Sequence, residues 1–193
     1  MDALLATFIA VFLAEIGDRS QILAAALALR YHNNKAVLAG LTLATLLNCA
    51  LSATIGSRVD DWISDEPLRL FTALAYIFAG AGMLIWRRPV DILTRWKLGA
   101  LGTSFTGLFI LQFGDKSQFL IAAHAANTQV WGFALAGGIL GVLGACIPAI
   151  LLRERLAVII PLNLIRKIAG SLLLLWGIFL ALDALALVSQ LAG

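Results

Sequence analysis

The sequence Glu15-Ile16-Gly17-Asp18-Arg19-Ser20-Gln21 recurs 97 residues later as Gln112-Phe113-Gly114-Asp115-Lys116-Ser117-Gln118. Each copy lies inside a long apolar stretch, so five ionisable side chains occur where hydrocarbon is expected. A charged side chain at the centre of a bilayer costs about 3 kcal/mol on insertion scales. A chain tolerates this twice only if these side chains face one another or face water. The repeated motif therefore predicts a buried polar site built from two halves of the chain.

The composition is that of an integral membrane protein. Of the 193 residues, 61% are hydrophobic and 13% are charged, whereas a soluble domain carries about 25% charged residues. The net charge of +3 comes from basic residues in short loops, which gives no indication of nucleic-acid binding. We expect an all-α, polytopic membrane protein.

Six apolar spans are expected, at residues 3–29, 36–56, 68–86, 98–126, 130–152 and 164–189. About 20 apolar residues cross a bilayer as a helix. The first and fourth spans are longer than this, and both contain the motif. The extra length allows these spans to tilt, or to break near Gly17 and Gly114.

The two halves of the chain match well beyond the motif. At the same offset Phe8 corresponds to Phe105 and Cys49 to Cys146. Each half has three spans, an odd number, so two halves in tandem must cross the membrane in opposite senses. We therefore predict two inverted three-helix repeats, residues 1–97 and 98–193, with a site near the midplane where they meet.

The distribution of basic residues predicts the orientation. Ten Lys and Arg residues fall on one side of the six spans and two, Arg58 and Arg69, on the other. The ten are Arg30, Lys35, Arg87, Arg88, Arg95, Lys97, Arg153, Arg155, Arg166 and Lys167. Because the more basic side is normally cytoplasmic, both termini are expected outside the cytoplasm.

The motif side chains are suited to bind a hard cation. On a continuous helix, residues three apart share a face, so Glu15, Asp18 and Gln21 would form one stripe. The second stripe would consist of Gln112, Asp115 and Gln118. Carboxylate, amide and hydroxyl oxygens suit Mg²⁺, Ca²⁺ and Mn²⁺ rather than copper or zinc. We expect Glu15, Asp18, Gln112 and Asp115 to coordinate the ion, supported by Gln21, Gln118, Ser20 and Ser117.

The motif also contains two cations and two glycines. Arg19 and Lys116 are expected to pair with the aspartates and to be displaced when an ion binds, or alternatively to extend toward an interface. Gly17 and Gly114 allow close backbone approach or a local break in the helix.

Several other residues have a structural explanation. Cys49 and Cys146 are expected to be small packing residues, with a role as soft ligands as the alternative. Asn48 is expected either to touch the site or to hydrogen-bond a neighbouring helix. Gly137 and Gly141 are expected to form a close-packing face for another helix.

The chain resembles the GDT family of small six-helix cation exchangers, which carries twin E-x-G-D-[KR]-[ST] motifs. The first motif matches at Glu15, Gly17, Asp18, Arg19 and Ser20, and the second at Gly114, Asp115, Lys116 and Ser117. The second departs at Gln112, where the family has Glu. The resemblance implies export of Mn²⁺, or exchange of Ca²⁺ or Mn²⁺ for protons, with the motif acids as ligands. Since Gln112 cannot ionise, we expect fewer protons to be exchanged per ion than with four acids.

Taken together, these features predict a secondary transporter that exports Mn²⁺ across the plasma (inner) membrane of a prokaryote. No nucleotide-binding motif is present, so an ion gradient is the expected driving force. No cofactor is expected, and the metal is a substrate. The alternatives are a Ca²⁺/H⁺ antiporter and an exporter of a cationic small molecule. An enzyme is not expected, because no nucleophile–base pair is evident. The oligomeric state and the choice between Mn²⁺ and Ca²⁺ stay open.

Overall fold

The computed structural model describes residues 1–59, 61–85, 89–153 and 161–191. This part of the chain contains eight α-helices and no strand. They are α1 (Asp2–Glu15), α2 (Arg19–Tyr31), α3 (Asn34–Val59), α4 (Asp65–Ile85), α5 (Gly99–Gln112), α6 (Lys116–Ala126), α7 (Trp131–Leu152) and α9 (Leu162–Leu191).

The first and fourth expected spans are each built from two short helices. The chain leaves helical geometry between α1 and α2 and again between α5 and α6, at the two motifs. Gly17 and Gly114 both have φ of +70°, the left-handed region that glycine adopts at little cost. Of the two expected possibilities, tilting or breaking, the structure therefore has the break.

Many large apolar side chains lie on the surface, and several polar side chains are buried. Four of the described helices, α3, α4, α7 and α9, are long and apolar enough to span a membrane. Large apolar side chains such as Ile55, Leu74 and Leu175 are exposed, whereas Glu15, Asp18 and other polar residues are buried. A water-soluble core shows the opposite pattern. The chain is a multi-pass membrane protein.

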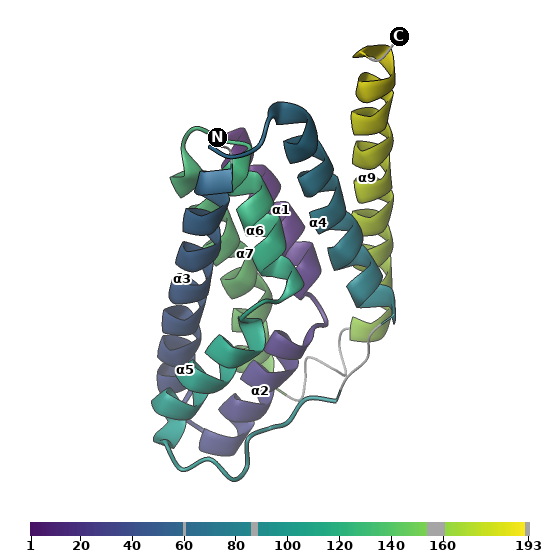
Figure 1. Ribbon diagram of the computed structural model, residues 1–193. Coiled ribbons are helices and arrows are strands. Elements are labelled where there is room, and N and C mark those ends of the chain that lie inside the picture. The colour runs from purple at the N-terminus through teal and green to yellow at the C-terminus, as the bar shows by residue number, and fades with distance from the viewer. Residues whose placement is uncertain (60, 86–88, 154–160, 192–193) are drawn as a thin grey trace.

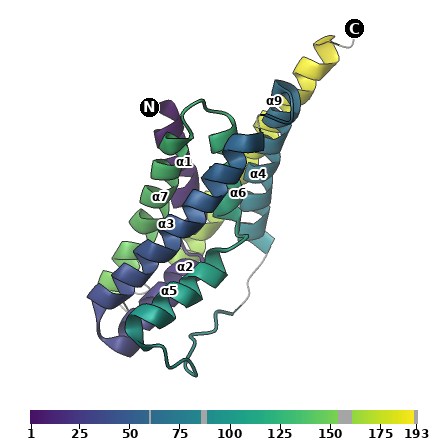
Figure 2. The same ribbon diagram turned by 60° about the vertical axis from the view of Figure 1, so that its left-hand side comes forward.

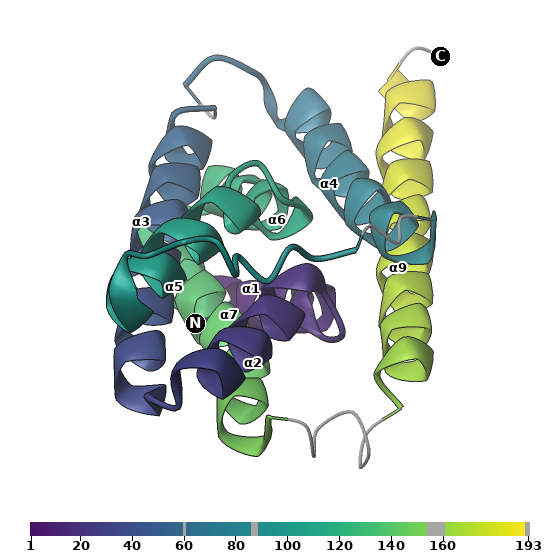
Figure 3. The same ribbon diagram turned by 90° about the horizontal axis from the view of Figure 1, so that it is seen from below.

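The helices form a bundle with one pair beside it. α1 packs against α7, and α3 packs against α5 and α6. α4 and α9 pack most extensively against each other, and Figure 3 shows them to one side of the other helices. Figures 1 and 2 show this pair beside the upper part of the bundle, with α2 and α5 below it.

The start of α1 and the end of α9 lie at one end of the molecule (Figure 1). The connections after α2 and before α5 lie at the other end. Three residues that contribute to the predicted charge asymmetry, Arg87, Arg88 and Arg155, lie outside the described residues.

Glycines allow the closest helix contacts. In α7, a Cβ at Gly137 would lie 3.0 Å from the Phe8 nitrogen, and a Cβ at Gly141 would lie 2.9 Å from the Val11 Cβ. The close-packing face expected on this helix is therefore confirmed, and its partner is α1. In α4, a Cβ at Gly80 would lie 2.5 Å from the Leu174 nitrogen of α9.

We expect Gly80→Ala to destabilise the protein by about 1–3 kcal/mol, because the added methyl forces α4 and α9 apart. Gly82→Ala is the matched control, since nothing lies within 4 Å of a Cβ at Gly82. Thermal unfolding in detergent measures both variants. An equal melting temperature for the two would contradict this account of the contact.

Candidate functional site

The two aspartates occupy equivalent positions at the breaks. Asp18 is the residue before α2 and Asp115 is the residue before α6, and both have extended backbone conformations. Neither side chain forms a capping hydrogen bond with its own helix. Their carboxylate oxygens are therefore available to other groups, at the end of each helix where the helix dipole attracts negative charge.

Two glutamines bind the backbone of the breaks. The Gln21 Oε1 accepts a hydrogen bond from the Gly17 N–H at 2.9 Å, and the Gln118 Oε1 accepts one from the Gly114 N–H at 2.9 Å. The Gln21 Nε2 donates to the Ala145 carbonyl at 2.7 Å. Each glutamine thus reaches back over the first turn of its helix to the glycine that precedes the aspartate. Both amide oxygens are therefore already used by the backbone.

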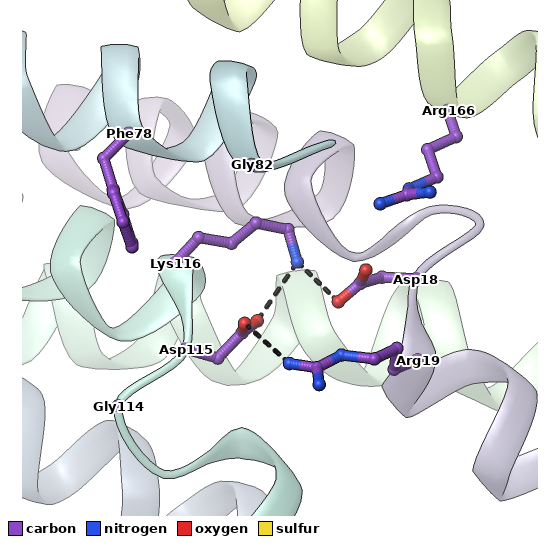
Figure 4. A pocket seen from close by; sticks show the side chains of 8 residues that line it. All are labelled: Asp18, Arg19, Phe78, Gly82, Gly114, Asp115, Lys116 and Arg166. Carbon is purple, nitrogen blue, oxygen red and sulfur yellow. Dashed lines mark hydrogen bonds and ion pairs between the residues drawn. The ribbon is translucent and has the colours of Figure 1, made fainter. Parts of the chain in front are cut away.

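One ammonium group joins the two motifs. The Lys116 Nζ lies 2.5 Å from the Asp18 Oδ2 and 3.1 Å from the Asp115 Oδ2, as Figure 4 shows. The Arg19 guanidinium lies 3.8 Å from the Asp115 Oδ1. The side chains of Lys116 and Asp18 are each only 6% exposed, so this pair is shielded from water. Opposite-facing segments thus place Asp18 and Asp115 around a single cation.

Glu15 and Gln112 end the two helices that lead into the breaks. Glu15 is fully buried, and Gln112 is 3% exposed. Neither carboxylate oxygen of Glu15 forms a hydrogen bond that meets ordinary geometric criteria. The carboxyl group lies within electrostatic range of Lys116, Asp115 and Asp18. Ser20 and Ser117 are also buried. Ser117 lies close enough to act on the Glu15 carboxyl group, but a buried carboxyl group without a well-formed hydrogen bond is costly, so Glu15 has oxygens available for a further partner.

The expectation of continuous polar stripes is wrong. The i, i+3 relation needs an unbroken helix, and residues 16–18 and 113–115 lie outside the helices. Glu15 therefore belongs to α1, while Gln21 belongs to α2 and faces the backbone of its own cap. The motif side chains converge through the breaks rather than along one helical face.

A cavity of about 250 Å³ adjoins the carboxylates. Its lining consists of motif residues from both halves together with Phe78 and Gly82 of α4 and Arg166 of α9. Figure 4 shows the Arg166 side chain extending toward Asp18. The basic-residue count placed Arg166 on the more basic side, at the start of the span expected at residues 164–189, and did not predict that it lines the cavity. The sequence feature that could have drawn attention to Arg166 is its match to Arg69 at the repeat offset of 97 residues.

Asn48 contacts the second motif. Its Oδ1 accepts a hydrogen bond from the Gln118 Nε2 at 2.7 Å, and its Nδ2 donates to the Phe109 carbonyl at 3.2 Å. Both expected alternatives for Asn48 therefore apply, because it touches a motif residue and links α3 to α5. Cys49 and Cys146 are both buried and form no disulfide.

Within the described ranges, no group of three or more His, Cys, Asp or Glu side chains is arranged to hold a metal ion. Lys116 lies between the two aspartates. A divalent cation that bound both carboxylates would have to displace this ammonium group.

Comparison with known proteins gives a consistent result. The sequence profile of the divalent cation/proton antiporter GDT1 matches residues 3–89 and 100–187. A Vibrio cholerae protein named "Putative manganese exporter" is 34% identical over 181 residues, which covers 91% of this chain and 88% of the relative.

Two plant relatives are more distant. GDT1-like protein 3 of Arabidopsis thaliana is 26% identical over 72% of this chain, and GDT1-like protein 4 of Oryza sativa subsp. indica is 27% identical over 72%. The matched segments cover 56% and 59% of these two proteins. No solved structure matches the chain.

We expect Lys116→Met to destabilise the protein by about 3–5 kcal/mol, because it leaves the buried carboxylate of Asp18 and the half-buried one of Asp115 without their shared cation. Thermal unfolding in detergent measures the loss, and Lys97→Met, at an exposed position, is the control. Added Mn²⁺ should restore part of the stability by replacing the ammonium charge. A melting temperature equal to that of the control would contradict the role assigned to Lys116.

Proposed function

We propose a transport mechanism on the premise that the chain belongs to the GDT1 family of divalent cation/proton antiporters. The chain exports a divalent cation in exchange for protons, and Mn²⁺ is the main proposed substrate. The printed name of the Vibrio cholerae relative supports manganese as the substrate. The oxygen-only set of side chains at the motifs supports a hard cation.

The observation that carries this proposal is the convergence of Asp18 and Asp115 on one ammonium group. Two carboxylates that share one positive charge are close enough to share a metal ion instead. Glu15, Asp18, Gln112 and Asp115 supply the oxygen ligands, and Lys116 withdraws as the ion enters. Lys116 and Arg19 thus act as internal counter-ions that keep the carboxylates paired between transport events.

Proton exchange follows from the burial of Glu15. A carboxylate with no hydrogen bond in the interior needs a compensating positive charge, which either a metal ion or a proton supplies. Binding of the cation therefore releases a proton, and protonation weakens the site and releases the cation. The chain is a transporter and not an enzyme, and it carries the metal as a substrate rather than as a cofactor.

The proposed membrane topology has six spans in two inverted repeats. The pairs α1–α2 and α5–α6 each form one broken span, as is usual where a transport site lies at mid-membrane. The separate matches of the family profile to residues 3–89 and 100–187 support repeats at residues 1–97 and 98–193. Both termini lie outside the cytoplasm of a prokaryotic cell, a placement supported by the basic residues on the opposite side.

In proteoliposomes, we expect the protein to transport Mn²⁺ and to move protons in the opposite direction. Asp18→Asn and Asp115→Asn should each lower Mn²⁺ affinity by more than about 100-fold, since loss of even an outer-shell partner costs 10- to 100-fold. Asp61→Asn, in an exposed ion pair with Arg58, is the matched control. Transport of Ca²⁺ but not Mn²⁺ would favour the Ca²⁺/H⁺ alternative, and uptake of neither ion would refute the proposal.

Gln112 stands where the family motif has Glu, and this difference leads to a prediction about the number of protons exchanged per metal ion. Gln112→Glu adds a fourth carboxyl group to the buried site, so the number of protons exchanged per ion should rise by about one. Simultaneous measurement of Mn²⁺ flux and internal pH with a dye gives the ratio. Gln129→Glu, at an exposed position, controls for added charge. An unchanged ratio in Gln112→Glu would show that this position does not exchange a proton.

A further inference from the structure

The two halves make equivalent contacts inside the bundle. A Cβ at Gly40 of α3 would lie 2.8 Å from the Phe105 nitrogen of α5, and a Cβ at Gly137 of α7 would lie 3.0 Å from the Phe8 nitrogen of α1. Each residue in one contact matches a residue in the other at the repeat offset of 97. The contacts α3–α5 and α7–α1 are therefore related by the internal symmetry.

The α4–α9 pair is symmetric within itself in the same way. A Cβ at Gly80 of α4 would lie 2.5 Å from the Leu174 nitrogen, and a Cβ at Gly177 of α9 would lie 2.7 Å from the Ile77 nitrogen. Gly80 matches Gly177, and Ile77 matches Leu174. The pair is thus one tightly packed unit with its own two-fold relation.

The placement of this pair on the bundle breaks the symmetry. A Cβ at Gly17 would lie 2.9 Å from the Leu162 carbonyl oxygen and 3.0 Å from the Arg166 Cβ, both at the start of α9. A Cβ at Gly114 would have nothing within 4 Å. Yet the two glycines are equivalent and have the same φ. The first break is covered by α9, and the second break is not covered by α4.

Polar contacts hold the pair in this asymmetric position. In α4, the Tyr76 hydroxyl lies 2.9 Å from the His124 Nε2 of α6. The Asn127 Nδ2 donates to the Thr72 Oγ1 at 2.7 Å. The residues at the equivalent positions of the other half are Leu173, Leu27, Arg30 and Ala169. Arg30 instead donates hydrogen bonds to the carbonyl oxygens of Leu93, Thr94 and Trp96 in the connection before α5.

We infer that α4 and α9 move together, as one unit, against the bundle of the other six described helices. In a second arrangement α9 lies on α2, and α4 covers the second break. Asp65 and Arg69 then contact Gly114 as Leu162 and Arg166 now contact Gly17. This inference rests on the proposed transport function, since it names the moving unit that exposes the site to alternate sides.

Rocking of one half against the other is the alternative motion for an inverted repeat. Such a motion would break the close contacts at Gly40 and Gly137, whereas movement of the α4–α9 pair preserves them and the contact at Gly80. Only contacts between the pair and the bundle are exchanged, and the positions that make them have counterparts in the other half at the repeat offset, although the two hydrogen bonds at the end of α6 have none. Arg69 and Arg166 are positioning residues in this scheme, because each one in turn lies beside the carboxylates.

Pairs of cysteines test the movement in the full chain, in membranes, after both native cysteines are replaced by alanine. The first pair, Thr72→Cys with Asn127→Cys, joins residues that are in contact here. The second pair, Ala169→Cys with Arg30→Cys, joins the equivalent residues, which meet only in the second arrangement. Thr72→Cys with Arg30→Cys is the control, since these positions meet in neither arrangement.

Both pairs should form disulfides under mild oxidation, and the control pair should not. Each disulfide should abolish Mn²⁺ flux, and reduction should restore it. Leu27→Cys with Leu173→Cys repeats the test of the second arrangement without altering Arg30. If neither of the pairs that report the second arrangement forms while the first pair does, the inference is wrong. Mn²⁺ flux of the parent chain is measured separately, so failure of the proposed transport function is recognised on its own.

Substitution of the two glycines gives an independent test, because asparagine tolerates the left-handed conformation but adds a side chain. Gly114→Asn has room in the present arrangement and collides with α4 in the second one. It should therefore lower the yield of the second disulfide about tenfold, as an overpacked contact does. Gly17→Asn should act in the opposite sense and lower the yield of the first disulfide. Equal effects of both variants on both disulfides would overturn the inference.

Discussion

The arrangement of this protein depends on the ammonium group of Lys116, which lies between the carboxylates of Asp18 and Asp115. Two like charges in a water-poor interior repel each other strongly, and only a shared cation makes their proximity favourable. Every other feature of the site serves to bring these three groups together. The breaks in the two spans direct the aspartates inward, where the side chains of Lys116 and Asp18 are each only 6% exposed and attract each other more strongly than they would in water.

The breaks require a division of roles between neighbouring residues. A broken helix in a membrane leaves backbone N–H groups that must be satisfied within the protein. An aspartate at the start of a helix would ordinarily do this, and it would then be lost to the site. Here Gln21 and Gln118 accept hydrogen bonds from the Gly17 and Gly114 N–H groups inside the breaks, and neither aspartate forms a capping hydrogen bond, so the aspartates remain free to bind cations. The glutamines are therefore structural partners of the aspartates rather than further ligands.

The sequence was sufficient to predict an all-helical membrane protein, two places at which a span could break and the meeting of the two motifs, because each depends on local composition and on the repeat. It was insufficient for Arg166, which enters the cavity from α9 and lies far from either motif in the chain. The stripe predicted for Glu15 and Gln21 failed because helical spacing was applied across a break. Interpretation of Asn48 required knowledge of which helix lies opposite it, and a single sequence does not supply this.

The repeat also explains why the placement of α4 and α9 could not be predicted. An internal symmetry in the sequence defines contacts that are equivalent between the two halves. It does not determine which of two equivalent contacts forms. That preference comes from the positions where the halves differ, such as His124 against Leu27 and Asn127 against Arg30. Each of these differences adds or removes a hydrogen bond that contributes about 1 kcal/mol. Because these terms are small, the two proposed arrangements stay close in free energy. A transporter needs such a balance, since a bound ion can then determine which side of the membrane the site faces.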